Sequence, residues 1–207
     1  MRCSWILLIA TMCVADGSAQ PIVPEKPRFG VVPNYDLYPQ TTPKAALETA
    51  IKLLENKRYD YFLAHVLAPD LLQAKIADRA ARLEPAVEQS FLRKRELQTR
   101  SPESVRPRDR LPVEPKDFAL AVSAEAVDRS FRYIVEDLKM HLDEYPENLR
   151  VFRKFLAEGQ VADAGPSASF THKDVAGKSI YLKNIAKRWY LEDRQTDEPK
   201  PVPMPGK

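Results

Sequence analysis

Apolar residues recur every three or four positions over most of the chain, which predicts a largely helical domain. The first run begins after Thr42, a suitable N-cap, with Pro43 at the first helical position. Asn56 is placed to end this helix. A second short helix is expected to start in the stretch Arg58 to Leu63, with Asp60 as a candidate cap, and to end before Pro69. The apolar positions of the first helix are Ala46, Leu47, Ala50, Ile51 and Leu54.

Three further helical stretches follow the break at Ala68-Pro69-Asp70. In the first, Asp70 can cap, and Pro85 is expected to interrupt a stripe of Leu71, Leu72, Ile76, Ala80, Leu83, Val87, Phe91 and Leu97. In the second, Ser123 is the expected N-cap of a stripe of Val127, Phe131, Ile134, Val135, Leu138 and Leu142. In the third, Pro146 opens and Gly159 ends a helix that carries Leu149, Phe152, Phe155 and Leu156.

The last part of the chain changes to a period of two, which is typical of half-buried strands. One strand is expected from Ser167 to His172, and a hairpin follows with a connection of four or five residues around Asn184 to Lys187. We expect its inward side chains to be Ile180, Leu182, Trp189 and Leu191, with Tyr181, Lys183, Tyr190 and Glu192 outward. The opposite register would place Glu192 in a pocket beside Tyr181 and would favour an enzyme, because a desolvated carboxylate can act as a base.

These patterns together predict a single α+β domain over residues 42–195, with helices packed on a small, curved antiparallel sheet of mostly C-terminal strands. Prolines mark the segments outside regular structure. Residues 20–41 form an extended linker whose apolar residues can lie along the domain surface. A basic, mobile loop is expected at about 99–116, and a disordered tail at 196–207.

The first nineteen residues resemble a secretory signal, with Arg2, a short apolar run and Gly17-Ser18-Ala19 before the cleavage point. Export to the periplasm or the extracellular space is therefore expected. An uncleaved anchor, or a lipoprotein acylated at Cys13, is the alternative. Cys3 and Cys13 are the only cysteines, so cleavage leaves a chain without disulfides, thiol nucleophiles or thiolate metal sites.

Two stretches resemble nuclear-transport-factor-2-like domains of exported bacterial proteins. They are Thr42 to Leu47 with Arg58-Tyr59-Asp60-Tyr61, and Gly177-Lys178 with Arg188 to Leu191. The resemblance covers about Thr42 to Arg194 and implies a cone-shaped roll, in which helices and a curved sheet leave a pocket. The basic loop and the missing glycine at Ala186-Lys187 depart from the pattern. Because no position matches the catalytic carboxylate of enzymatic members, the resemblance supplies no site residue.

Motifs for cofactors and metals are missing from the sequence. His65, His141 and His172 lack ligand spacing, and no glycine-rich loop can hold a phosphate, so we predict neither a metal nor a cofactor. A ligand or partner patch is predicted at Tyr59, Tyr61, Phe62, Tyr181 and Tyr190; the first three are alternatively a packing joint between helices. The basic loop is predicted to bind anions weakly through Arg106, Arg108 and Arg110, although it lacks the aromatics that stack on nucleic-acid bases.

The expected function is binding without catalysis, with a protein or a small apolar molecule as the ligand. The predicted core stripes contain no Asp, Glu or His, which favours this class over an enzyme. An enzyme acting in a cone-shaped pocket and a weak anion-binding module are the alternatives. A buried ionisable side chain facing a cavity would support the enzyme.

Overall fold

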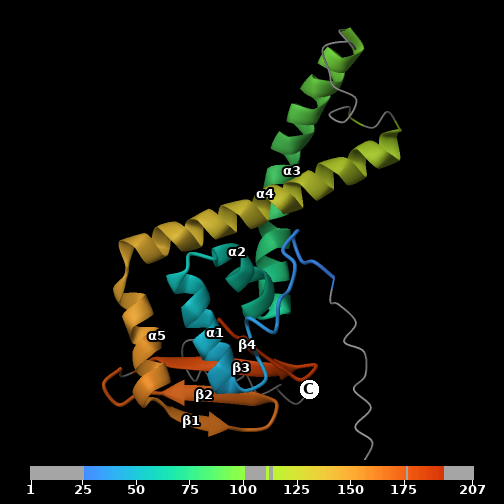
Figure 1. Ribbon diagram of the computed structural model, residues 1–207. Helices are drawn as coiled ribbons and strands as arrows, with labels where there is room; N and C mark the ends of the chain where they lie inside the picture. The colour runs from blue at the N-terminus through green and yellow to red at the C-terminus, as the bar shows by residue number, and fades with distance from the viewer. Residues whose placement is uncertain (1–25, 101–110, 112–113, 176, 194–207) are drawn as a thin grey trace, which may run out of the picture.

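The structure is a computed structural model that describes residues 26–100, 111, 114–175 and 177–193. Its helices are α1 (Pro43–Glu55), α2 (Tyr59–Tyr61), the π-helix η1 (Phe62–Val66), α3 (Pro69–Arg100), α4 (Pro115–Glu144) and α5 (Glu147–Glu158). Its strands are β1 (Gln160–Asp163), β2 (Ser167–Thr171), β3 (Ser179–Ile185) and β4 (Arg188–Leu191). Every strand follows the helices, so the predicted α+β class with C-terminal strands is confirmed (Figure 1).

The four strands form one antiparallel sheet in the order β1-β2-β3-β4. Strand β1 is not predicted by the sequence, because its four residues are all exposed and so show no alternation of buried and exposed positions. The β3–β4 connection is shorter than predicted. Only Ala186 and Lys187 link the strands, with φ values of 51° and 66°, the left-handed values of a tight hairpin turn.

The predicted inward face of the hairpin is confirmed. Leu182 pairs with Leu191, and Asn184 with Trp189, so Trp189 and Leu191 share the face that carries Ile180. All four predicted inward side chains belong to the main core. The prediction of a solvent-facing opposite side was wrong for two residues, since Tyr181 and Tyr190 are 3% and 5% exposed. Alternation alone does not distinguish a covered polar face from a solvated one.

Two predicted helix boundaries were also wrong. The helix α3 continues through Pro85, because Val87 and Phe91 beyond it pack against α4 in a second cluster. Pro85 removes one backbone hydrogen bond without ending the helix. The helix α4 begins at Pro115, eight residues before the predicted cap, and Ser123 instead donates a hydrogen bond to Glu84 Oε1 (2.5 Å).

The N-terminal segment (residues 26–41) packs on the domain more closely than a linker. Val31 O lies 2.9 Å from His65 Nε2, and the Asn34 backbone N–H donates to the Tyr61 hydroxyl. Gln40 O accepts from the Trp189 backbone N–H, which covers the outer edge of β4. The Phe29 ring stacks on Phe131 of α4 at 4.8 Å. The predicted cleavage site and C-terminal tail lie outside the described residues.

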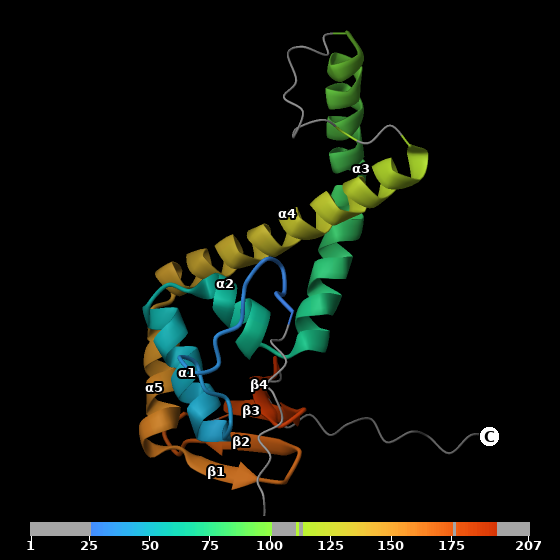
Figure 2. The ribbon, with the colours of Figure 1, turned by 45° about the vertical axis from the view of Figure 1, so that its right-hand side comes forward.

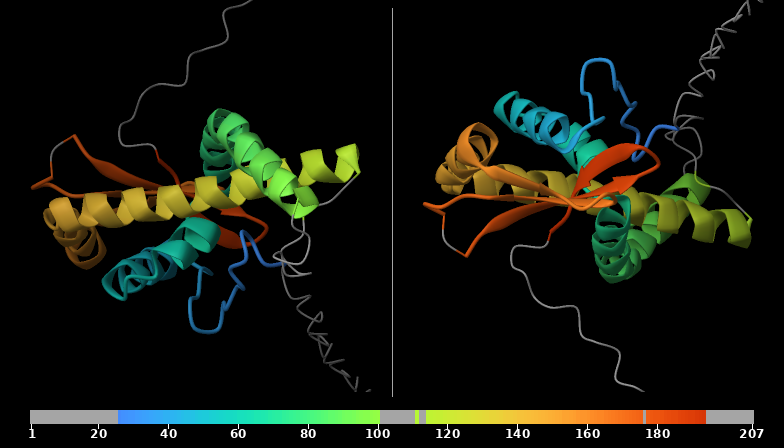
Figure 3. Two further views of the ribbon diagram at one scale, coloured as in Figure 1. Left: turned by 90° about the horizontal axis from the view of Figure 1, so that it is seen from above. Right: turned by 90° about the horizontal axis from the view of Figure 1, so that it is seen from below.

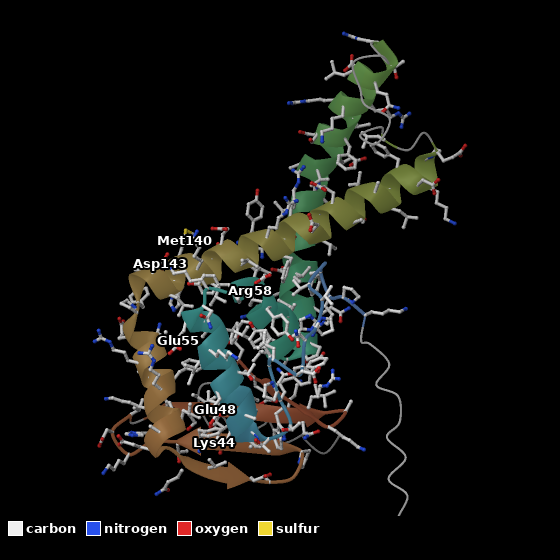
Figure 4. All side chains as sticks on the ribbon, viewed as in Figure 1. Lys44, Glu48, Glu55, Arg58, Met140 and Asp143 are labelled. Carbon is white, nitrogen blue, oxygen red and sulfur yellow. The ribbon has the colours of Figure 1, made fainter. Side chains whose placement is uncertain are left out.

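Seen from above, α4 crosses the molecule with α1 on one side and α3 on the other (Figure 3). The exposed side of α1 carries Lys44, Glu48 and Glu55 (Figure 4). Its buried side carries Leu47, Ala50 and Leu54, so the helix is amphipathic as predicted. Across the described part of the chain, each helix is too short or too polar to pass through a bilayer.

An ion pair ties the start of α3 to the sheet. Lys183 Nζ lies 2.6 Å from Asp70 Oδ2, and it lowers the pKa of the Asp70 carboxyl below its usual range. Asp70 was predicted as a cap, but it lies inside the first turn after Pro69. Beside it, the Ala68 N–H donates to Leu191 O, so strand β4 and α3 meet here.

We expect Asp70→Asn to cost less than about 1 kcal/mol at neutral pH, because the carboxylate is largely exposed. A lowered pKa stabilises the fold above the carboxyl's unfolded-state pKa, and this contribution disappears as pH falls through the folded-state pKa. The difference from the unmodified protein should therefore shrink on acidification. Urea denaturation at several pH values measures it. Asp36→Asn, also exposed, is the control; a difference for Asp70→Asn that persists in acid would contradict the ion-pair explanation.

Candidate ligand-binding groove

A half-open groove of about 1020 Å³ lies between the helices and the end of the sheet. Its walls come from α3, α4 and α5, and further lining residues come from η1 and the ends of β3 and β4. In Figure 2, α4 spans the space from α3 to α5 above the strands. The single long helix α4 therefore sets the separation of the two walls.

Apolar side chains make up most of the groove's interior. They are Leu54, Phe62, Leu63, Leu67, Leu72, Ile134, Leu138, Leu142, Val151, Phe152, Phe155, Ile180 and Leu191. The three from α4 are spaced four residues apart and so line one side of the helix. Phe152 and Phe155 are three residues apart on α5, so their side chains lie on the same face of the helix. Both helices thus turn an apolar stripe toward a space that they do not fill.

Charged residues surround the groove in pairs of opposite sign. Lys75 Nζ lies 2.6 Å from Asp193 Oδ2, and Arg79 Nη1 lies 2.6 Å from Asp137 Oδ2. Arg82 also pairs with Asp78, one turn apart on α3. The side chains of each pair are a third or more exposed, so each pair contributes little to stability. Paired charges leave the entrance without a strong field of either sign, which favours an uncharged ligand body.

The ionisable side chains of the groove lie at its surface rather than in its depth. Its lining aspartates and Glu147 are exposed, and Glu192 is half-buried. His141, also exposed, lies 3.2 Å from the Asn148 side chain. Glu192 reaches the groove although Trp189 faces the core, because it lies one residue beyond the end of β4. Glu192 therefore lies at the groove with Trp189 facing the core, and its position does not require the opposite strand register.

Two histidines are buried in the described residues, and neither lines the groove. His65 lies at the contact between η1 and the N-terminal segment, where its ring nitrogen meets Val31 O. His172 lies behind α5 with its Nδ1 accepting from the Asp174 N–H, and its Nε2 is 3.4 Å from Glu158. Within the described part of the chain, no three His, Cys, Asp or Glu side chains are arranged to hold a metal.

The predicted patch of aromatic residues is divided by the fold. Phe62 lines the groove, whereas Tyr59, Tyr61, Tyr181 and Tyr190 are buried elsewhere. Burial is the main reason why the pKa of Tyr61 is raised above its ordinary value. For Tyr59 and Tyr61 the structure favours the packing joint, the alternative given by the sequence, whereas Phe62 both packs in the core and lines the groove. The predicted anion-binding residues Arg106, Arg108 and Arg110 lie outside the described residues.

Most apolar residues of the groove were recognised in the sequence as core positions. Ile134, Leu138, Leu142, Phe152 and Phe155 all belong to predicted apolar stripes. A stripe shows which side of a helix avoids water, but it does not show whether the opposing surface fills the space. The rim residues Lys75, Arg79 and Asp137 gave no signal, because charged residues on an exposed helix face are ordinary.

Comparison of the chain with protein-family models, with curated proteins and with solved structures finds no match. The resemblance to nuclear-transport-factor-2-like domains thus stays a prediction.

Proposed function

We propose that this protein binds a small, predominantly apolar molecule in the groove between α3, α4 and α5, without catalysing a reaction. The observation that carries the proposal is the concave space of about 1020 Å³ lined by thirteen apolar side chains. Small-molecule sites have volumes of roughly 300–1,000 Å³ and predominantly apolar walls. The groove is at the upper end of this range, which suits an extended chain or a fused-ring body.

The paired rim charges support an uncharged ligand body over an anion. The concave shape supports a small molecule over a folded protein partner, which would need a broad, flatter surface. The enzyme alternative has less support, because neither of the two buried histidines lines the groove and its carboxylates are exposed, apart from the half-buried Glu192. Export, and the membership of the predicted domain family, remain parts of the same proposal.

The test is a titration with the apolar fluorophore N-phenyl-1-naphthylamine, whose emission rises in apolar surroundings. We expect saturable binding to the purified protein. Leu138→Trp places a larger ring in the groove and should raise the dissociation constant at least about 10-fold, or 1.4 kcal/mol. Competition by fatty acids, alcohols and sterols would then rank candidate ligand classes.

Met140→Trp is the matched control. It makes the same kind of change two residues away on α4, at a side chain that is 59% exposed and outside the groove lining (Figure 4). Binding by this variant should equal that of the unmodified protein. Equal affinities for the Leu138→Trp variant and the control, or a lack of saturable binding, would overturn the proposal.

A further inference from the structure

A helical arm extends away from the domain and the groove. We define it as residues 86–100 of α3 and residues 114–128, which comprise Glu114 and the start of α4. The two helices cross near the domain and separate beyond the crossing (Figures 1 and 2). In both views the sheet and the other helices lie on the far side of this crossing.

The arm and the crossing share a small apolar cluster of their own. Its buried members are Ala80, Val87, Phe91, Phe118, Val122 and Ala126, and none belongs to the main core. The Phe91 and Phe118 rings meet edge to face at 6.1 Å. Two long helices that share only one small cluster leave most of their remaining surface uncovered. Because helices in proteins are stabilised chiefly by packing, a further packing surface would stabilise this arm.

A second apolar stripe on α4 lies uncovered in the arm. Leu120, Ala124 and Val127 are spaced four and three residues apart, and the same spacing continues through Phe131, Ile134 and Leu138. The latter three pack on the main core. In the arm the stripe is exposed, with 61% for Leu120 and 36% for Val127. A repeat of 3.5 residues is the pattern of a seam between two helices.

The two halves of the arm carry opposite charge. Residues 86–100 of α3 contain four basic and two acidic side chains, whereas residues 114–128 contain one basic and four acidic ones. Two of these acidic side chains, Glu125 and Asp128, are matched within α4 by Arg129 and Arg132, so the acidic end of the arm is the first turn of α4 with Glu114 and Asp117. Such a surface is complementary to itself when it is turned around a two-fold axis, because the basic helix of one copy then meets the acidic helix of the other. This complementarity identifies the partner as a second copy of the chain.

We propose that the helical arm is a homodimer interface, in which the exposed stripe Leu120, Ala124 and Val127 packs against the arm of a second copy. The two arms form a four-helix cluster, with α3 of each copy beside α4 of the other. The two domains, each with its groove, then lie at opposite ends of the dimer, so that each groove can bind ligand independently. The interface uses no residue of the groove lining.

Sedimentation equilibrium of the purified protein tests this inference. We expect a dimer at micromolar concentration that weakens with added salt. Leu120→Glu with Val127→Glu should raise the dimer dissociation constant at least about 30-fold, as loss of a central apolar contact does. The control is Val161→Glu, which changes an exposed valine on β1, far from the arm in sequence and fold, and should leave the dimer intact. Unchanged helical circular dichroism distinguishes dissociation from unfolding.

A charge exchange tests the pairing itself. The variant with Arg93→Glu and Lys94→Glu makes both halves of the arm acidic, and the variant with Glu114→Lys and Asp117→Lys makes both basic. Each variant alone should be monomeric, and an equimolar mixture should form a heterodimer. A monomeric unmodified protein, a dimer that survives the Glu substitutions, or a mixture that stays monomeric would each overturn the proposal. Binding of the monomeric protein to lipid vesicles through the arm would assign the stripe to a different occupant.

Discussion

Replacing Trp189 with Ala is expected to lower the free energy of unfolding by about 3–5 kcal/mol. The side chain is 5% exposed and belongs to the main core, which also contains Leu182 and Leu191 of the same hairpin face. Truncation removes a large apolar surface and leaves a cavity that a rigid sheet cannot close. Against a typical domain stability of about 5–15 kcal/mol, this loss is a large fraction. Guanidinium denaturation followed by circular dichroism measures it.

Two control substitutions separate burial from other effects. Tyr133→Ala removes an aromatic ring that is 49% exposed on α4 and should cost no more than about 1 kcal/mol. Glu192→Gln changes a half-buried side chain just beyond β4 without changing its size, and should alter stability by about 1 kcal/mol or less. A small cost for Trp189→Ala together with a large one for Glu192→Gln would contradict the observed face assignment and would favour the enzyme alternative.

Phe155→Ala is expected to cost a comparable 3–5 kcal/mol and to weaken ligand binding as well. Phe155 is 1% exposed, and its ring meets the edge of buried His172 with centroids 6.1 Å apart. It joins α5 to the sheet and lines the groove, so its removal disturbs the core and one wall together. Denaturation and fluorophore titration on the same preparation, at a temperature at which the variant stays folded, give the two effects.

Phe152→Ala provides the comparison within the same helix. Phe152 also lines the groove but is only half-buried, so we expect a cost of about 1–2 kcal/mol from the smaller area returned to water. Its effect on the dissociation constant should be similar to that of Phe155→Ala. If Phe152→Ala leaves ligand binding unchanged while Phe155→Ala abolishes it, then the wall of the groove is not the binding surface, and loss of the fold explains the second result.

The structure also shows why some sequence predictions failed while neighbouring ones held. Proline and capping residues describe local preference, and both Pro85 and Ser123 were interpreted locally. Each lies within a helix because side chains of α3 and α4 pack on each other at this crossing. The contact between Phe91 and Phe118 joins residues on either side of the 101–114 connection, which a local pattern does not reveal.

The sequence by itself determined the apolar side of each helix, the α+β order of elements and the inward face of the hairpin. These features follow from periods of 3.6 and 2, which are properties of the local backbone. Tertiary structure alone decided that α3 and α5 stand apart under α4 and leave a groove. It also decided that the apolar stripe of α4 is exposed up to Val127 and covered by the main core from Phe131 onward. Whether a stripe is covered depends on which other elements reach it in the folded protein. The spacing of apolar residues along one helix does not contain that information.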